Sequence, residues 1–159
     1  MDGIKMRGFF RVAIEEKGHI VGDSGFVQNL ITNAGIELFM ARTFGGQAGS
    51  LQVGFMSLGT GAAPASNETS LAGETLAASK RVAPTYAFSQ RAASDGTATV
   101  QFTATFASSD GFLSGAANLS NIGLFNSISG GSLMAGNTFA SSSCNTNQNV
   151  NVTYQIRLN

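Results

Sequence analysis

The chain has 159 residues, the size of one domain with its own hydrophobic core, and only 11% of them are charged, against about a quarter in an average soluble protein. Nine Lys and Arg residues balance nine Asp and Glu residues, and this zero net charge argues against binding to nucleic-acid phosphates and against an acidic disordered tail. Cys144 is the single cysteine and His19 the single histidine, which excludes an intrachain disulfide and a metal site built from thiolates or imidazoles.

The remaining composition is rich in small and neutral residues. Glycine occurs 20 times, proline twice and tryptophan not at all. Little charge repulsion keeps such chains apart, which favours a subunit of an assembly over a free enzyme. No stretch approaches the roughly 20 apolar residues of a membrane span, and charges interrupt residues 1–11, so we expect neither a membrane segment nor a secretory signal.

The N-terminal residues 4–14 alternate in the period of a half-buried strand, with Ile4, Met6, Phe10, Val12 and Ile14 on one face. A turn at residues 16–18 leads to a shorter partner strand at 19–22. We therefore expect residues 1–18 to form a strand or an arm, and residues 19–159 to form the body. Phe9, Phe10 and Arg11 are the candidates for contact with a partner, although filling the core is the favoured role of Phe10.

Residues 32–46 are the one segment that predicts an α-helix. Thr32 or Asn33 can cap its start, and Gly45-Gly46 can end it. Helical spacing predicts a single apolar stripe made of Ile36, Phe39, Met40 and Phe44. We expect this stripe to cover one end or face of a sheet.

From Leu51 onward the pattern is strand and turn. Strands are expected at 51–55, 81–90, 97–106, 118–126, 132–140 and 150–158, with a short helical turn within 68–80 and an exposed crossing at 141–149. The second hairpin turns at Ser129-Gly130-Gly131. Seven or eight short strands without intervening helices predict a mainly β fold, an antiparallel β-sandwich or jelly roll, with one short helix in the N-terminal half.

Candidate chemistry is sparse in this pattern. The loop Gly59-Thr60-Gly61 lacks the lysine of a phosphate-binding loop, so turn formation explains its glycines. His19 lies beside a turn, and Cys144 is expected to be a modestly exposed spectator thiol. The nearest carboxylate pairs are Glu15 with Glu16 and Asp95 with Asp110. We expect no catalytic residue, no cofactor and no metal, and hence no enzyme.

Five stretches, taken in order, resemble a family of small virion proteins of tailed bacteriophages. They are residues 29–35, residues 58–61 with 67–71, residues 121–126, residues 129–135 and the alternating C-terminal strand. The resemblance spans about residues 20–159, and its motif residues include Gly59, Gly61, Gly123, Leu124 and Phe125, which it implies are structural. Asn121 departs from the family, which often has an acidic residue at this position. The resemblance therefore implies no ion pair for Asn121.

The resemblance implies a virion component that is made in the cytoplasm of the host bacterium. Because 159 residues leave no room for a long shaft, the expected role is a capsid decoration (cement) protein that binds the major capsid protein and stabilises the shell. Threefold capsid positions favour a homotrimer. The alternative is a tail, baseplate or tail-fibre component that binds the host surface.

Overall fold

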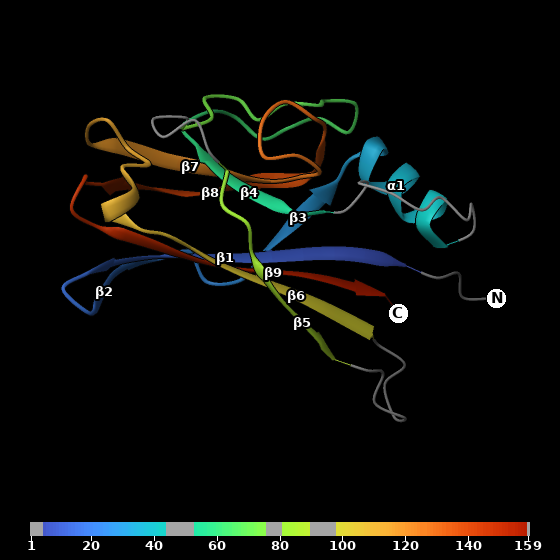
Figure 1. The fold of residues 1–159 in the computed structure, drawn as a ribbon, viewed down its shortest axis with the longest axis horizontal. Helices are drawn as coiled ribbons and strands as arrows, with labels where there is room; N and C mark the ends of the chain where they lie inside the picture. Colours follow the sequence, from blue (N-terminus) through green and yellow to red (C-terminus); the bar gives the residue numbers. More distant parts are fainter. Residues whose placement is uncertain (1–4, 44–52, 76–80, 90–97, 159) are drawn as a thin grey trace.

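The fold is mainly β, with one α-helix in the described part of the chain (Figure 1). The computed structural model describes residues 5–43, 53–75, 81–89 and 98–158. The strands are β1 (Met6–Glu16), β2 (His19–Asp23), β3 (Val27–Ile31), β4 (Phe55–Gly59), β5 (Thr85–Ser89), β6 (Ala98–Phe106), β7 (Ala117–Phe125), β8 (Leu133–Cys144) and β9 (Asn149–Leu158), with helix α1 (Asn33–Thr43) and the 3-10 turn η1 (Ser108–Asp110). The expected fold class is confirmed.

One curled antiparallel sheet makes both layers of the sandwich. Its strand order is β4-β7-β8-β3-β1-β9-β6-β5, and β2 pairs with β1 outside this path. Strand β3 joins the layers, because its start pairs with β1 (Phe10 opposite Val27) and its end pairs with β8 (Ile31 opposite Ala135). In Figure 1, β4, β7 and β8 lie above, and β1, β9, β6 and β5 lie below.

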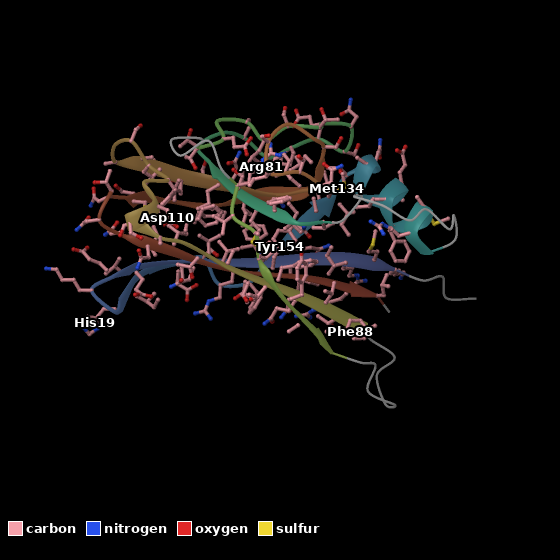
Figure 2. The ribbon with its side chains drawn as sticks, in the orientation of Figure 1. His19, Arg81, Phe88, Asp110, Met134 and Tyr154 are labelled. Carbon is pink, nitrogen blue, oxygen red and sulfur yellow. The ribbon has the colours of Figure 1, made fainter. Side chains whose placement is uncertain are left out.

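The core lies between these two layers and follows the alternation of the strands. Phe10 of β1 stacks on Tyr154 of β9 with ring centroids 5.9 Å apart, and both side chains are fully buried. Figure 2 places Tyr154 at the centre, between the layers. Leu119, Ile122 and Leu124 of β7 cover them from the upper layer. The alternation predicted for the C-terminal strand is confirmed, since Val150, Val152 and Tyr154 all point inward.

Strand β1 is a central strand of the lower layer. It pairs with β9 along ten residues, from Met6 opposite Leu158 to Glu15 opposite Asn149. On its other side it pairs with β3 and β2. We expected the first 18 residues to form either a strand or an arm. Residues 6–16 form a strand that is part of the body.

The apolar stripe predicted for the helix is wrong. Thr32 caps α1 as expected, because its Oγ1 accepts a hydrogen bond from the Gly35 N–H at 3.2 Å. However, Ile36 and Met40 are 47% and 50% exposed, whereas Leu38 is buried. The close approach of Gly35 explains this orientation, since a Cβ added there would lie 2.1 Å from the Met134 carbonyl oxygen.

The expected ends of the helix and of that stripe, Phe44 and Gly45-Gly46, lie outside the described residues. Figure 1 shows α1 at one end of the sandwich, beside β3. The helix thus covers one end of the fold, as expected, through a different face. No helix in the described part of the chain is long and apolar enough to cross a membrane.

The other differences concern loops. The expected exposed crossing at 141–149 is confirmed but shorter, because β8 continues to Cys144. The exposed residues 145–147 lead from β8 in the upper layer to β9 in the lower layer, in a turn closed by a hydrogen bond from the Gln148 N–H to the Asn145 carbonyl. The expected exposed thiol is wrong, because Cys144 is fully buried, and burial raises its pKa. The expected helical turn is absent from residues 68–75, while 76–80 lie outside the described residues.

Candidate functional site

Four of the five stretches that carry the family resemblance are joined in and beside the upper layer, and the fifth, the C-terminal strand β9, lies in the lower layer. Gly59 of β4 pairs with Asn121 of β7. The Leu133 N–H donates to the Thr69 carbonyl at 2.8 Å, and the Asn33 N–H donates to the Ser66 carbonyl at 2.8 Å. The loop between β4 and β5 is thereby bonded to the start of β8 and to the start of α1. We call this region, formed by residues 58–75, 121–126 and 129–135 with the start of α1, the motif cluster.

Asn121 holds the loop of the motif cluster from below. Its buried Nδ2 donates to the carbonyls of Ala62 and Ala72 at 3.1 and 2.9 Å. An ionised carboxylate has no proton to donate, so an acidic residue at this position could not make these two bonds. Gly59 and Gly61 leave the space for this packing, because an added Cβ would lie 2.3 Å from Asn121 Oδ1 and 2.4 Å from the Ala72 carbonyl oxygen, respectively.

Arg81 is the main polar residue of this region, and sequence reasoning missed it. Its guanidinium binds both carboxylate oxygens of Glu74, at 2.6 and 3.1 Å, and the carbonyls of Ser127 and Gly130 at 3.0 and 2.5 Å. It also lies over the ring of Phe125, 3.3 Å from the ring centroid. Figure 2 shows Arg81 above the upper layer, under the loops. Buried and bonded in this way, Arg81 joins two loops of the motif cluster.

No periodic pattern could have identified Arg81 and Glu74, because neither residue lies in a regular strand or helix. The motif residue Leu124 is a core residue, and Gly123 makes room for the Leu133 side chain, whose Cδ1 would lie 2.6 Å from an added Cβ. The motif residues named from the sequence thus have structural contacts.

The three candidate contact residues of β1 do not share one surface. Phe10 is fully buried, so it fills the core and is not available to a partner. Phe9 points to the outer face, where the Arg157 guanidinium lies 4.5 Å from its ring centroid. Arg11 forms an ion pair with Asp23 of β2 at 2.5 Å, and this hydrogen-bonded pair lowers the pKa of Asp23 to about 2.

The outer face of the lower layer carries a ladder of amides and hydroxyls beside charged side chains such as Glu15 and Arg157. Gln155 donates to Gln101 at 2.8 Å, and the hydroxyls of Thr85 and Thr103 are 2.7 Å apart. Asn151 donates to Glu15 at 2.8 Å. These amides and hydroxyls bind one another and the neighbouring charged groups, and they give this face hydrogen-bonding capacity.

An apolar cavity of about 580 Å³ opens between the layers at the α1 end. Its walls include Leu38 and Phe39 of α1, Tyr86 and Phe88 of β5, and Ile156 of β9. The Tyr86 hydroxyl donates to the Val53 carbonyl at 2.9 Å, which turns the ring of Tyr86 toward Phe102. The site can hold apolar groups, and among its described lining residues the charged side chain is that of Arg42.

Strand pairing places His19 of β2 opposite Glu16 of β1. Figure 2 shows His19 near the tip of the β1–β2 hairpin, and Asp110 follows β6 in the η1 turn. Within residues 5–43, 53–75, 81–89 and 98–158, no three His, Cys, Asp or Glu side chains form a group that could hold a metal ion. No protein-family model, curated protein or solved structure matches the chain.

Most of the large apolar side chains that are exposed in the described residues belong to or adjoin elements at the two ends of the sandwich, and Leu30 and Ile128 lie elsewhere. Ile20, Val21 and Phe26 lie in or next to β2, and Ile36, Met40, Tyr86 and Phe88 lie on α1 and β5. Figure 1 shows β2 and α1 at opposite ends of the molecule. Such groupings are typical of surfaces that contact other molecules, and they are the candidate functional surfaces of this chain.

Proposed function

We propose that the chain is a structural protein of the virion of a tailed bacteriophage, and that it acts as a capsid decoration (cement) protein. The observation that carries this proposal is the ordered set of motifs, whose segments the fold joins by direct hydrogen bonds in the motif cluster. Motifs that are distant in the sequence and adjacent in space are typical of a shared fold. The proposal therefore rests on a likeness of fold-determining residues rather than on a catalytic site.

The surfaces of the molecule fit this role. A protein that binds only the assembled shell stabilises it by mass action, and the binding energy comes from apolar area buried at the contact. Ile20 and Val21 of β2, at one end of the molecule, are each more than half exposed, and so is Phe26, in the segment between β2 and β3. We propose that this end contacts the major capsid protein, with Phe9 and Arg11 of β1 as further contact candidates.

The proposed partners are thus other virion proteins, and the proposed working place is the virion, after synthesis in the host cytoplasm. A homotrimer suits the threefold positions of a capsid. The proposal includes no nucleic acid, no membrane, no cofactor and no catalytic step.

Cryo-electron microscopy of the parent particle tests the location of the chain. The expected result is density for the two-layered fold on the outside of the shell, with the β1–β2 hairpin toward the major capsid protein. Density at the tail alone would contradict the decoration role. Absence of the chain from purified particles would contradict any virion role.

A tail, baseplate or tail-fibre role with host-surface binding is the second candidate. The observation that favours it is the ladder of amides and hydroxyls on the outer face of β1, β9, β6 and β5, since such groups form hydrogen bonds with sugars. A glycan array probed with the full chain tests it. Specific signals that Gln101→Ala and Thr103→Ala abolish would support this role, and an array without hits would count against it.

A further inference from the structure

Two of the three edge strands in the described part of the sheet are protected. The free side of β4 is covered by its own chain, because Met56 and Val82 exchange two backbone hydrogen bonds at 2.8 and 3.0 Å, and the Thr75 N–H donates to the Leu58 carbonyl. Strand β2 carries Asp23, and its pairing with β1 shifts register between Ile14 and Glu15. Charges and irregular registers are common means of preventing strand edges from pairing with other chains.

Strand β5 has no such protection. It pairs with β6 on one side, from Thr85 opposite Thr103 to Ser89 opposite Thr99, and no pairing occupies its other side in the described residues. Its sequence, Thr-Tyr-Ala-Phe-Ser, contains neither a charge nor a proline. Tyr86 and Phe88 are 55% and 69% exposed. An uncharged edge strand with exposed aromatic side chains is a template for strand addition.

We propose that β5 pairs in antiparallel fashion with β5 of a second copy of this chain, with Ala87 opposite Ala87. The choice of a second copy follows from the sequence of the strand, which is complementary to itself in this register. Tyr86 lies opposite Phe88 of the other copy, twice, and position 85 lies opposite position 89. Cross-strand aromatic pairs stabilise antiparallel sheets, and no like charges meet across the contact.

The same register places the aromatic pairs over the apolar cavity. Tyr86 and Phe88 both line that cavity from β5, so pairing with a partner's aromatic rings reduces their exposure to water. Ala87 points to the opposite, outer face, beside Gln101 of β6. The contact is two-fold and joins the lower layers of two molecules into one continuous sheet. It does not depend on the proposed virion role.

Introducing a charge at Ala87 tests the pairing, because the two copies of this exposed residue face each other in the proposed register. Ala87→Lys and Ala87→Glu each place like charges directly opposite, which disfavours pairing. In sedimentation equilibrium we expect the wild-type mass to rise with concentration toward an even number of chains. Each variant alone is expected to lose this rise, and an equimolar mixture of the two to regain it. Impaired folding could explain loss in a single variant, but it could not explain recovery in the mixture.

Oxidative cross-linking supplies a second measurement. Opposed residues of antiparallel strands have Cα atoms about 4.5 or 5.5 Å apart, both within disulfide range. Ala87→Cys should therefore form a covalent dimer readily, while the buried Cys144 stays unreacted. Val21→Cys, exposed on the edge strand β2, is the matched control. A wild-type mass that neither variant changes, or cross-linking of Ala87→Cys no faster than that of Val21→Cys, would overturn the proposal.

Discussion

Arg81 and Arg11 show how differently two ion pairs act in the same fold. The side chains of Arg81 and Glu74 are 6% and 10% exposed, whereas those of Arg11 and Asp23 are 45% and 33% exposed. When a buried pair loses one partner, the other charge stays buried without compensation, and stability falls strongly. When an exposed pair loses one partner, water solvates the remaining charge, and the loss is small. We therefore expect the loops of the motif cluster to depend on Arg81.

Arg81→Ala tests this dependence. It leaves the Glu74 carboxylate and two carbonyls without their donor, and we expect a loss of about 3 to 5 kcal/mol in the free energy of unfolding. Urea denaturation measures the change. The double variant Arg81→Met with Glu74→Gln should lose less, because no buried charge remains. Equal, small losses for Arg81→Ala and Arg11→Ala would contradict this interpretation of the cluster.

The exposed pair should be visible in the pH dependence of stability. The Arg11 guanidinium lowers the pKa of Asp23 from 3.8 to about 2, so the folded state binds this proton less readily than the unfolded state. The resulting stabilisation is present above about pH 4 and is lost as the pH falls toward about 2. We expect Asp23→Asn to flatten the pH dependence of the free energy of unfolding across this range, and Arg11→Gln to flatten it less, because the Gly25 N–H still donates to the Asp23 carboxylate. An unchanged acid slope in Asp23→Asn would contradict the pair.

Glycine substitutions test the close packing of the loop after β4. An alanine Cβ at Gly61 would lie within 2.4 to 2.6 Å of three Ala72 atoms, two of which belong to the backbone. We expect Gly61→Ala to lower the free energy of unfolding by about 1 to 3 kcal/mol, the usual range for overpacking. Gly115→Ala, where no atom lies within 4 Å, is the control. Thermal melts of both variants measure the change. Equal midpoint temperatures for Gly61→Ala and Gly115→Ala would contradict the observed loop packing.

Individual strands were predictable from the sequence because burial imposes a period of two on each of them. The alternation in β1, β6 and β9 identified Phe10, Phe102 and Tyr154 as inward-facing, and all three are buried. The orientation of α1 was not predictable in this way. Its packing face depends on the approach of Gly35 to the Met134 carbonyl, a contact between residues far apart in the chain.

Two substitutions on α1 distinguish the observed face from the expected stripe. Leu38 is buried against the core, so Leu38→Ala should lower the free energy of unfolding by about 2 to 4 kcal/mol. Ile36 is exposed, and Ile36→Gln should change it by less than about 0.5 kcal/mol. Chemical denaturation with both variants decides the point. A larger loss in the free energy of unfolding for Ile36→Gln than for Leu38→Ala would contradict the observed face and support the stripe predicted from the sequence.

At the scale of the whole molecule, the sequence predicts the fold class but not the strand order. Alternation predicts which side chains point inward, but it does not predict which strands are neighbours in the sheet. The order depends on β3, whose five residues pair with one layer at Val27 and with the other at Ile31. The motif cluster could be foreseen only as a set of motifs in order. The ion pair of Arg81 with Glu74 has no periodic signal at all.

We propose that this chain stabilises a capsid by binding to it. Particles made without the chain, heated while release of their DNA is followed by a fluorescent dye, test it most directly. The account predicts release at a lower temperature than from complete particles, and recovery when purified wild-type protein is added back. Identical release temperatures for complete and deficient particles would contradict it.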